Sequence, residues 1–176
     1  PYTRRELVLG TLIGRILVVG LGVTVGVVAG TLSMIVFGGA VDVGAMAVVL
    51  GLTLLLSTAI VGLAMGISAS VSTSSRAAIL GFGVFMVFYA FWNLVPLIVR
   101  YVLNGFSFAL GPTPEWVLIW NQLNPINAFR TAIAALTQQP LSGAFYHAVW
   151  FAVLVMLGWF VLSTTLGLLR FERTDL

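Results

Sequence analysis

The stretch Ile16–Val41, ILVVGLGVTVGVVAGTLSMIVFGGAV, contains no charged residue. Three further stretches without Asp, Glu, Lys or Arg follow it along the chain, at Val43–Ser75, Ala77–Val99 and Thr131–Leu169. About 20 apolar residues in a helix cross the roughly 30 Å of hydrocarbon in a bilayer, and each stretch is long enough to supply them. The sequence therefore predicts four membrane-spanning helices. They are placed at about 16–37, 45–67, 77–99 and 147–169.

Composition supports a membrane protein. Of the 176 residues, 60% are hydrophobic and 7% charged, and the mean hydropathy is +1.13, whereas about a quarter of an average soluble domain is charged. A chain this short cannot bury so much apolar surface in its own core, which excludes a soluble globular domain. A transmembrane β-barrel would show alternating ten-residue segments, and none are present. We therefore expect an all-α, polytopic helical membrane protein with a single transmembrane domain over residues 1–176.

The charges predict its orientation. All eight basic residues are arginines, and six of them fall on one side of the membrane if the four helices alternate: Arg4, Arg5, Arg15, Arg76, Arg170 and Arg173. Only Arg100 and Arg130 fall on the other side. The positive-inside rule then places both ends of the chain and the 68–76 loop in the cytoplasm, in a cell membrane. Because the arginines stand singly or in pairs at the edges of uncharged stretches, membrane lipid is an expected partner and nucleic acid is not.

The segment 104–143, expected on the outer side, predicts two short helices. Thr113-Pro114-Glu115 has the pattern of a helix start and precedes Trp116 and Trp120, which lie four residues apart and suit a membrane interface. Asn124-Pro125 repeats the pattern of a cap followed by proline. This second helix runs through Asn127 to Leu136. Both helices are too short to cross the bilayer and are expected to be interfacial or re-entrant.

Residues 1–15 predict a separate cytoplasmic amphipathic helix that leads into the first span. Thr3 can cap it, charges fill its first turn, and Leu9, Leu12 and Ile13 recur at helical spacing.

Small residues recur four apart in two of the spans. Gly22, Gly26 and Gly30 do so in the first span, and Gly62 and Gly66 in the second. Such spacing lets another helix backbone approach closely. Packing inside one subunit is the favoured interpretation over a dedicated dimer motif.

Asn93 and Pro96 lie near the outer end of the third predicted span. Proline removes a backbone donor there, which favours a kink, although the Asn93 amide can also contact a permeating substrate.

The residues that mark several other classes of membrane protein are absent from the sequence. No span carries a central charge, so a proton-coupled carrier is disfavoured. There is no His-Glu-x-x-His motif, no pair of intramembrane aspartates, and no P-loop pattern G-x-x-x-x-G-K-[ST]. We therefore expect no catalytic residue, cofactor site or metal site on this chain, and ATP-driven work requires a partner.

Five pieces of the sequence together resemble permeases of the ABC-2 type. They are RRELVLG at 4–10 with Gly14-Arg15, the Ser/Thr-rich segment 68–76, FWNLVP at 91–96, LNPINA at 123–128, and FERTDL at 171–176. The likeness is greatest to the permease of the nitrous-oxide-reductase maturation transporter and its archaeal relatives. Such permeases have six membrane helices against four here. With a start at Pro1 rather than Met, this suggests a processed or truncated portion whose first two helices lie upstream.

The resemblance implies a permease subunit of an ABC transporter, with ATP-Mg bound and hydrolysed by a separate P-loop ATPase subunit and a second permease subunit alongside. It implies an ATPase-coupling role for the entry residues Arg4, Arg5, Glu6, Gly10 and Arg15. It also suggests a kink or outer gate at Asn93, Pro96, Asn124, Pro125 and Asn127. A non-transporting helical scaffold or assembly subunit is the alternative, because it too needs no polar residue in its spans. The transported substrate and the direction of transport are left open.

Overall fold

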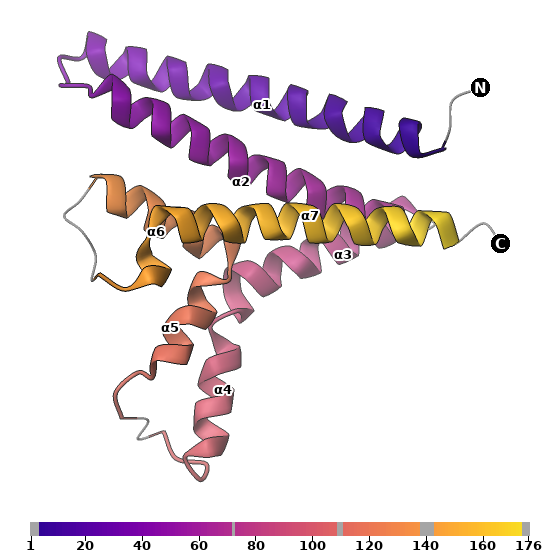
Figure 1. Ribbon diagram of the computed structural model, residues 1–176, viewed down its shortest axis with the longest axis vertical. Coiled ribbons are helices and arrows are strands. Elements are labelled where there is room, and N and C mark those ends of the chain that lie inside the picture. Colours follow the sequence, from indigo (N-terminus) through magenta and orange to yellow (C-terminus); the bar gives the residue numbers. More distant parts are fainter. Residues whose placement is uncertain (1–3, 72, 109–110, 138–142, 174–176) are drawn as a thin grey trace.

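The computed structural model describes residues 4–71, 73–108, 111–137 and 143–173, and nearly all of this backbone is helical (Figure 1). The helices in chain order are α1 (Arg4–Val36), α2 (Val43–Ala69), α3 (Ser74–Met86), the π-helix η1 (Val87–Phe91), α4 (Leu94–Leu103), α5 (Glu115–Gln122), α6 (Pro125–Thr137), the 3-10 turn η2 (Phe145–His147) and α7 (Val149–Arg173). Within the described ranges there is no strand. The all-α prediction is confirmed.

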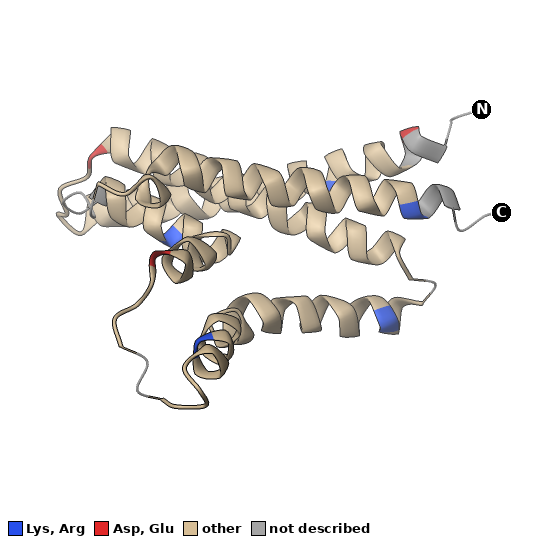
Figure 2. Ribbon diagram, turned by 60° about the horizontal axis from the view of Figure 1, so that its bottom comes forward, with Lys and Arg blue, Asp and Glu red and all other residues tan. Residues whose placement is uncertain are grey.

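Within the described residues, four helical segments are long and apolar enough to cross a membrane, which agrees with the predicted number of spans. They are Val8–Val36, Val43–Ala69, Ser74–Phe91 and Val149–Arg170. The start of α1 and the end of α7 lie at the same end of the bundle, which we call the termini end (Figure 1). Figure 2 shows that α2 and α7 carry no charge along their middle.

The prediction of a separate amphipathic helix over residues 1–15 is wrong. From Arg4 onward the chain forms one uninterrupted helix that includes the first span, and residues 1–3 lie outside the described part. No proline interrupts this helix, and helices tolerate single glycines such as Gly10 and Gly14. The apolar spacing has a different cause: Leu12 is buried beside Met65 of α2, whereas Ile13 remains exposed. Of these residues only Leu12 marks a contact between helices, since Leu9 and Ile13 are exposed.

The core forms where α2, α6 and α7 meet. Its buried members are small or flexible apolar residues that fit a three-helix contact: Leu52, Ala128, Ala132, Ala152, Val155 and Met156. Helix α1 lies along α2 on the other side, and α3 begins at the termini end beside α2 (Figure 1). Both of the short helices predicted in the 104–143 segment are present, as α5 and α6.

Helices α2 and α7 cross with their backbones in contact. A Cβ added to Gly66 would lie 2.5 Å from the Ser163 carbonyl oxygen, and one added to Gly167 would lie 2.7 Å from the Gly66 Cα. A Cβ on Gly62 would meet the Phe160 ring at 2.8 Å. Lipid offers no hydrophobic driving force between helices, so close approach at small residues supplies the packing contacts that hold them together. This crossing fixes α7 against α2.

The third span, predicted over 77–99 with a kink near Asn93 and Pro96, is interrupted before Pro96. It departs from α-helical geometry at η1 and turns at Trp92 and Asn93, after which α4 leaves the bundle crosswise (Figure 1). Pro96 explains the position of the turn, because a proline ring clashes with the carbonyl four residues earlier, here that of Trp92. The break therefore lies one helical turn before the proline.

Replacing Gly66 with alanine tests the α2–α7 crossing. The new Cβ would overlap a backbone carbonyl, which cannot rotate away as a flexible side chain can, so we expect a loss of about 1–3 kcal/mol in stability and a lower melting temperature of the purified protein. Gly51→Ala, on the same helix with nothing within 4 Å of the added Cβ, is the matched control and should melt no lower than wild type. Equal melting of the two variants would contradict the close crossing.

Candidate functional site

The break in the third span is closed by a reciprocal pair of tryptophans. The indole Nε1 of Trp120 donates to the Trp92 carbonyl oxygen at 3.1 Å, and the Trp92 Nε1 donates to the Trp120 carbonyl oxygen at 2.9 Å. The two rings stack with centroids 5.0 Å apart and planes inclined by 21°. The Trp92 carbonyl is the one that Pro96 cannot pair with, because proline has no N–H. Trp120 of α5 therefore supplies the hydrogen bond that the broken helix lacks.

Asn124 supplies a second side-chain hydrogen bond to the third span, one helical turn before Trp92. Its side chain is fully buried, and its Nδ2 donates to the Phe88 carbonyl oxygen in η1 at 2.6 Å. Its Oδ1 accepts from the backbone N–H groups of Ile126 at 2.9 Å and Asn127 at 3.4 Å. The same side chain thus caps the start of α6 and holds the π-helix. A single buried amide ties two segments that lie 36 residues apart in the chain.

Helix α7 completes this arrangement through Trp159. Its ring meets that of Phe88 edge to face at 4.8 Å, and its Nε1 donates to the Leu123 carbonyl oxygen at 2.9 Å. We call Phe88, Trp92, Trp120, Asn124 and Trp159 the aromatic junction. It joins η1, α5, the start of α6 and α7 through hydrogen bonds between side chains and backbone carbonyls.

The residues predicted for a kink or gate lie in and around the junction. Pro96 is buried in the first turn of α4, and Pro125 is fully buried as the first residue of α6. The Asn127 Nδ2 donates to the Asn121 carbonyl oxygen at 3.0 Å, which ties α6 to the end of α5. Asn93 differs, because it is exposed and makes no side-chain cap for α4. The structure thus brings Asn124, Pro125 and Asn127 together and leaves Asn93 outside.

Sequence reasoning missed the tryptophans as a group. Trp120 was assigned to the membrane interface with Trp116, but only Trp116 is strongly exposed, at 42%. The signal available was that Trp92 and Trp120 lie near element ends, where backbone carbonyls need donors, whereas Trp159 lies in the middle of α7. Nothing in their spacing pairs them with one another.

The predicted coupling residues lie along the first turns of α1. Glu6 and Gly10 are exposed, and no atom lies within 4 Å of a Cβ added to Gly10. Arg15 is also exposed, and its Nη1 lies 3.1 Å from the Met65 sulfur of α2. The backbones of Arg4 and Arg5 belong to α1, but their side chains lie outside the described residues. These positions share the termini end of the bundle.

The two glycine series occupy different surroundings. Gly62 and Gly66 are in the α2–α7 crossing. A Cβ added to Gly22, Gly26 or Gly30 would have no described atom of the chain within 4 Å. The first-span series therefore packs against nothing in the described chain.

Comparison with known proteins supplies the family. The model of the family described as ABC-2 family transporter protein matches residues 1–176, which is the whole chain. The chain belongs to the ABC-2 transporter family. A search of curated proteins finds no match.

Membership identifies the bundle as the membrane permease domain of an ABC transporter. In this family the membrane domain has no ATPase motif of its own, and ATP is used by a partner ATPase. The expected permease function is confirmed at this level. Helices with uncharged middles and an internally satisfied break are what any membrane-spanning domain requires, and they are consistent with this assignment.

Asn124→Ala should destabilise the permease. It leaves the Phe88 carbonyl without its buried donor, which costs about 1–3 kcal/mol, and removes the α6 cap, which costs about 0.5–2 kcal/mol. The melting temperature of the purified protein measures the loss. Asn93→Ala, at an exposed position that caps nothing, is the control and should be nearly neutral. A neutral Asn124→Ala would show that the buried amide does not hold the junction.

Trp120→Phe should cost more stability than Trp92→Phe. Both keep a stacking ring and lose one indole donor. The Trp120 carbonyl still accepts from the Leu123 N–H at 3.1 Å, whereas the Trp92 carbonyl has lost its helical donor to Pro96. Without Trp120 Nε1 the Trp92 carbonyl has no donor, which lowers the free energy of unfolding by about 1–3 kcal/mol. Equal melting temperatures of the two variants would contradict this account.

Proposed function

We propose that this permease is driven at the start of α1 by its ATPase partner and works beside a second permease subunit. The observation that carries the proposal is the continuity of α1 from Arg4 to Val36. At a rise of 1.5 Å per residue, the helix is about 50 Å long. Force applied at its first turns moves the whole helix, since no break absorbs it.

The coupling surface we propose consists of Arg4, Arg5, Glu6, Gly10 and Arg15. Charges clustered at one end of a membrane helix can pair with a soluble protein, and the positive-inside rule favours the cytoplasm, where ATP is available, for this end. The resemblance of this segment to the coupling segment of ABC-2 permeases supports the same role. Anchoring to anionic headgroups is the competing role for the arginines, and the experiment below separates the two.

The second permease subunit is proposed to lie against the face of Gly22, Gly26 and Gly30. These positions are open in the described chain, and a helix face of this kind accepts a close backbone neighbour. The substrate path would then lie between two copies and open alternately as α1 tilts against α2. This arrangement follows the family's usual pairing of two permeases.

The gate is proposed at the aromatic junction, which contacts α7 near the middle of its span through Trp159. Asn93 and Pro96 lie beside the break, and Asn124, Pro125 and Asn127 form the adjoining start of α6. Breaks in membrane helices are tolerated where the freed backbone groups are satisfied inside the protein, and π-helical turns are frequent at functional sites. The same stretches, 91–96 and 123–128, support the finer proposal that this chain functions in a similar way to the nitrous-oxide-reductase maturation permease.

Charge reversal tests the coupling role. In the full-length protein, Arg4→Glu with Arg5→Glu should reduce co-purification of the ATPase and its stimulation, since two repulsions replace two attractions. Arg130→Glu, an exposed arginine on α6, is the matched control and should leave both unchanged. Membrane insertion and yield are measured in parallel. Normal insertion with unchanged ATPase binding and stimulation would remove these residues from coupling, and a loss confined to insertion would favour headgroup anchoring.

A further inference from the structure

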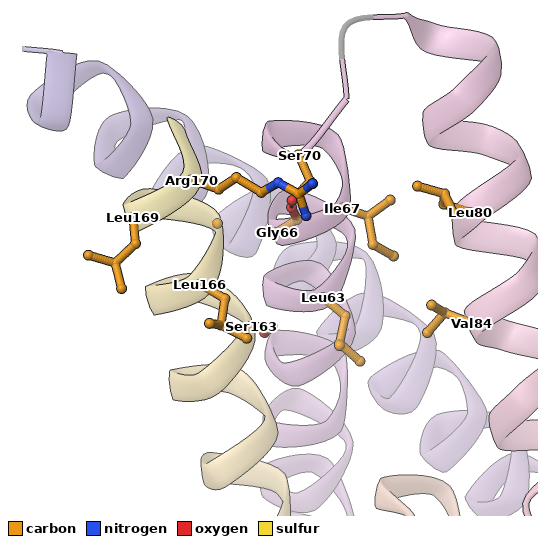
Figure 3. Close-up of a pocket in the computed structure, with 11 residues that line it drawn as sticks. Leu63, Gly66, Ile67, Ser70, Leu80, Val84, Ser163, Leu166, Leu169 and Arg170 are labelled. Carbon is orange, nitrogen blue, oxygen red and sulfur yellow. The ribbon is translucent and has the colours of Figure 1, made fainter. Parts of the chain in front are cut away.

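A groove opens at the termini end of the bundle, between α3 on one side and α2 with α7 on the other (Figure 3). Its volume is about 870 Å³, within the range of about 300–1,000 Å³ typical of small-ligand sites. Figure 3 shows Leu63 and Ile67 of α2 facing Leu80 and Val84 of α3 across it. Because this part of α3 and α7 belongs to spans, the groove opens at membrane depth.

The hydroxyl groups in its wall are already engaged. Ser70 Oγ donates to the Gly66 carbonyl oxygen at 2.7 Å, and Ser163 Oγ donates to the Trp159 carbonyl oxygen at 2.6 Å. Hydroxyls bonded to their own helix in this way present little polarity to a ligand. The wall of the groove is therefore suited to a hydrocarbon chain.

An arginine lines the mouth of the groove on the α7 side, and a second arginine stands in the first turn of α3. Arg170 of α7 lies at its edge, over the end of α2 beside Ser70 (Figure 3). Arg76 stands in the first turn of α3, four residues before Leu80, so the two Cα–Cβ bonds lie on the same side of this helix. The Arg76 side chain is exposed and does not itself line the groove. The amino terminus of α3, with its partial positive charge, is at the same place. Both α7 and α3 thus carry an arginine at the termini end of the bundle.

We propose that this groove binds an anionic phospholipid from the leaflet at the termini end, with an acyl chain between α2, α7 and α3 and the phosphate between Arg170 and Arg76. A basic mouth above an apolar groove matches a charged headgroup joined to a hydrocarbon chain. A guanidinium carries five N–H donors, so Arg170 can contact both the protein and a phosphate. The proposal does not depend on which side of the membrane the termini occupy, nor on ATPase coupling.

Lipid retention tests this site. The permease with its ATPase is exchanged into vesicles containing equal amounts of phosphatidylglycerol and phosphatidylcholine, extracted in mild detergent, and examined by native mass spectrometry. The wild type should retain phosphatidylglycerol in preference. Arg170→Gln and Arg76→Gln should each lower the ratio of the two retained lipids by about fivefold. Arg130→Gln is the matched control and should leave the ratio unchanged.

Two further variants distinguish the occupants of the groove. Val84→Trp fills the groove without changing its charge and should displace the lipid. If only the headgroup were bound, retention of the lipid would be unchanged in this variant. The chain has no cysteine, so Leu80→Cys provides a single cross-linking site on the groove wall, and it should react with a lipid-borne reagent. Cross-linking to a protein segment instead, retention without charge preference, or equal ratios for Arg170→Gln and Arg130→Gln would each overturn the proposal.

Discussion

The arrangement of the second half of the chain depends on one constraint: a backbone carbonyl inside a membrane must find a donor within the protein. Pro96 takes a donor away from the third span, and Trp120 replaces it. To reach the Trp92 carbonyl, α5 must fold back against the break, and this brings Asn124 to Phe88. The position of α6 follows, because Asn124 caps it. One missing N–H group thus accounts for the placement of two helices.

The helices around α2 are held with unequal strength. On the α7 side, glycines bring the two backbones into contact, and any side chain at Gly66 would collide with a carbonyl. On the α1 side, the nearest equivalent is Gly20, whose added Cβ would meet only the Leu54 side chain at 3.6 Å. A small gap of about 410 Å³ lies between α1 and α2 near this contact. Helix α1 can therefore shift against α2 at less cost than α7 can, which the proposed coupling through α1 requires.

The sequence was informative where local chemistry decides the structure. Uncharged stretches located the four spans, and Asn124-Pro125 located the start of α6, because the cap and the proline act within one turn. It failed where the decisive partner is distant. Trp120 pairs with a residue 28 positions away, and no local pattern encodes that pairing. Likewise, the glycine spacing is the same in the first and second spans, but only the second has α7 to pack against. The prediction of an amphipathic helix over residues 1–15 failed for a related reason. A residue such as Leu12 recurs at the same helical spacing whether it faces another helix or the membrane surface.

The chemistry of the junction also bears on how the permease can move. A sharp bend in a continuous helix would leave the local backbone carbonyls without their helical donors. At the break, two of these carbonyls accept instead from side chains of α5 and of the α6 cap. Such bonds can be exchanged one at a time, because an indole or an amide can rotate without unwinding a helix. The stacked faces of Trp92 and Trp120 keep the segments in contact during an exchange. A span built from α3 and η1 and joined to α6 through side chains can therefore change its angle while its carbonyls remain paired. A continuous helix over 77–99 would lack that freedom, which makes the break the part of the third span best suited to a transport cycle.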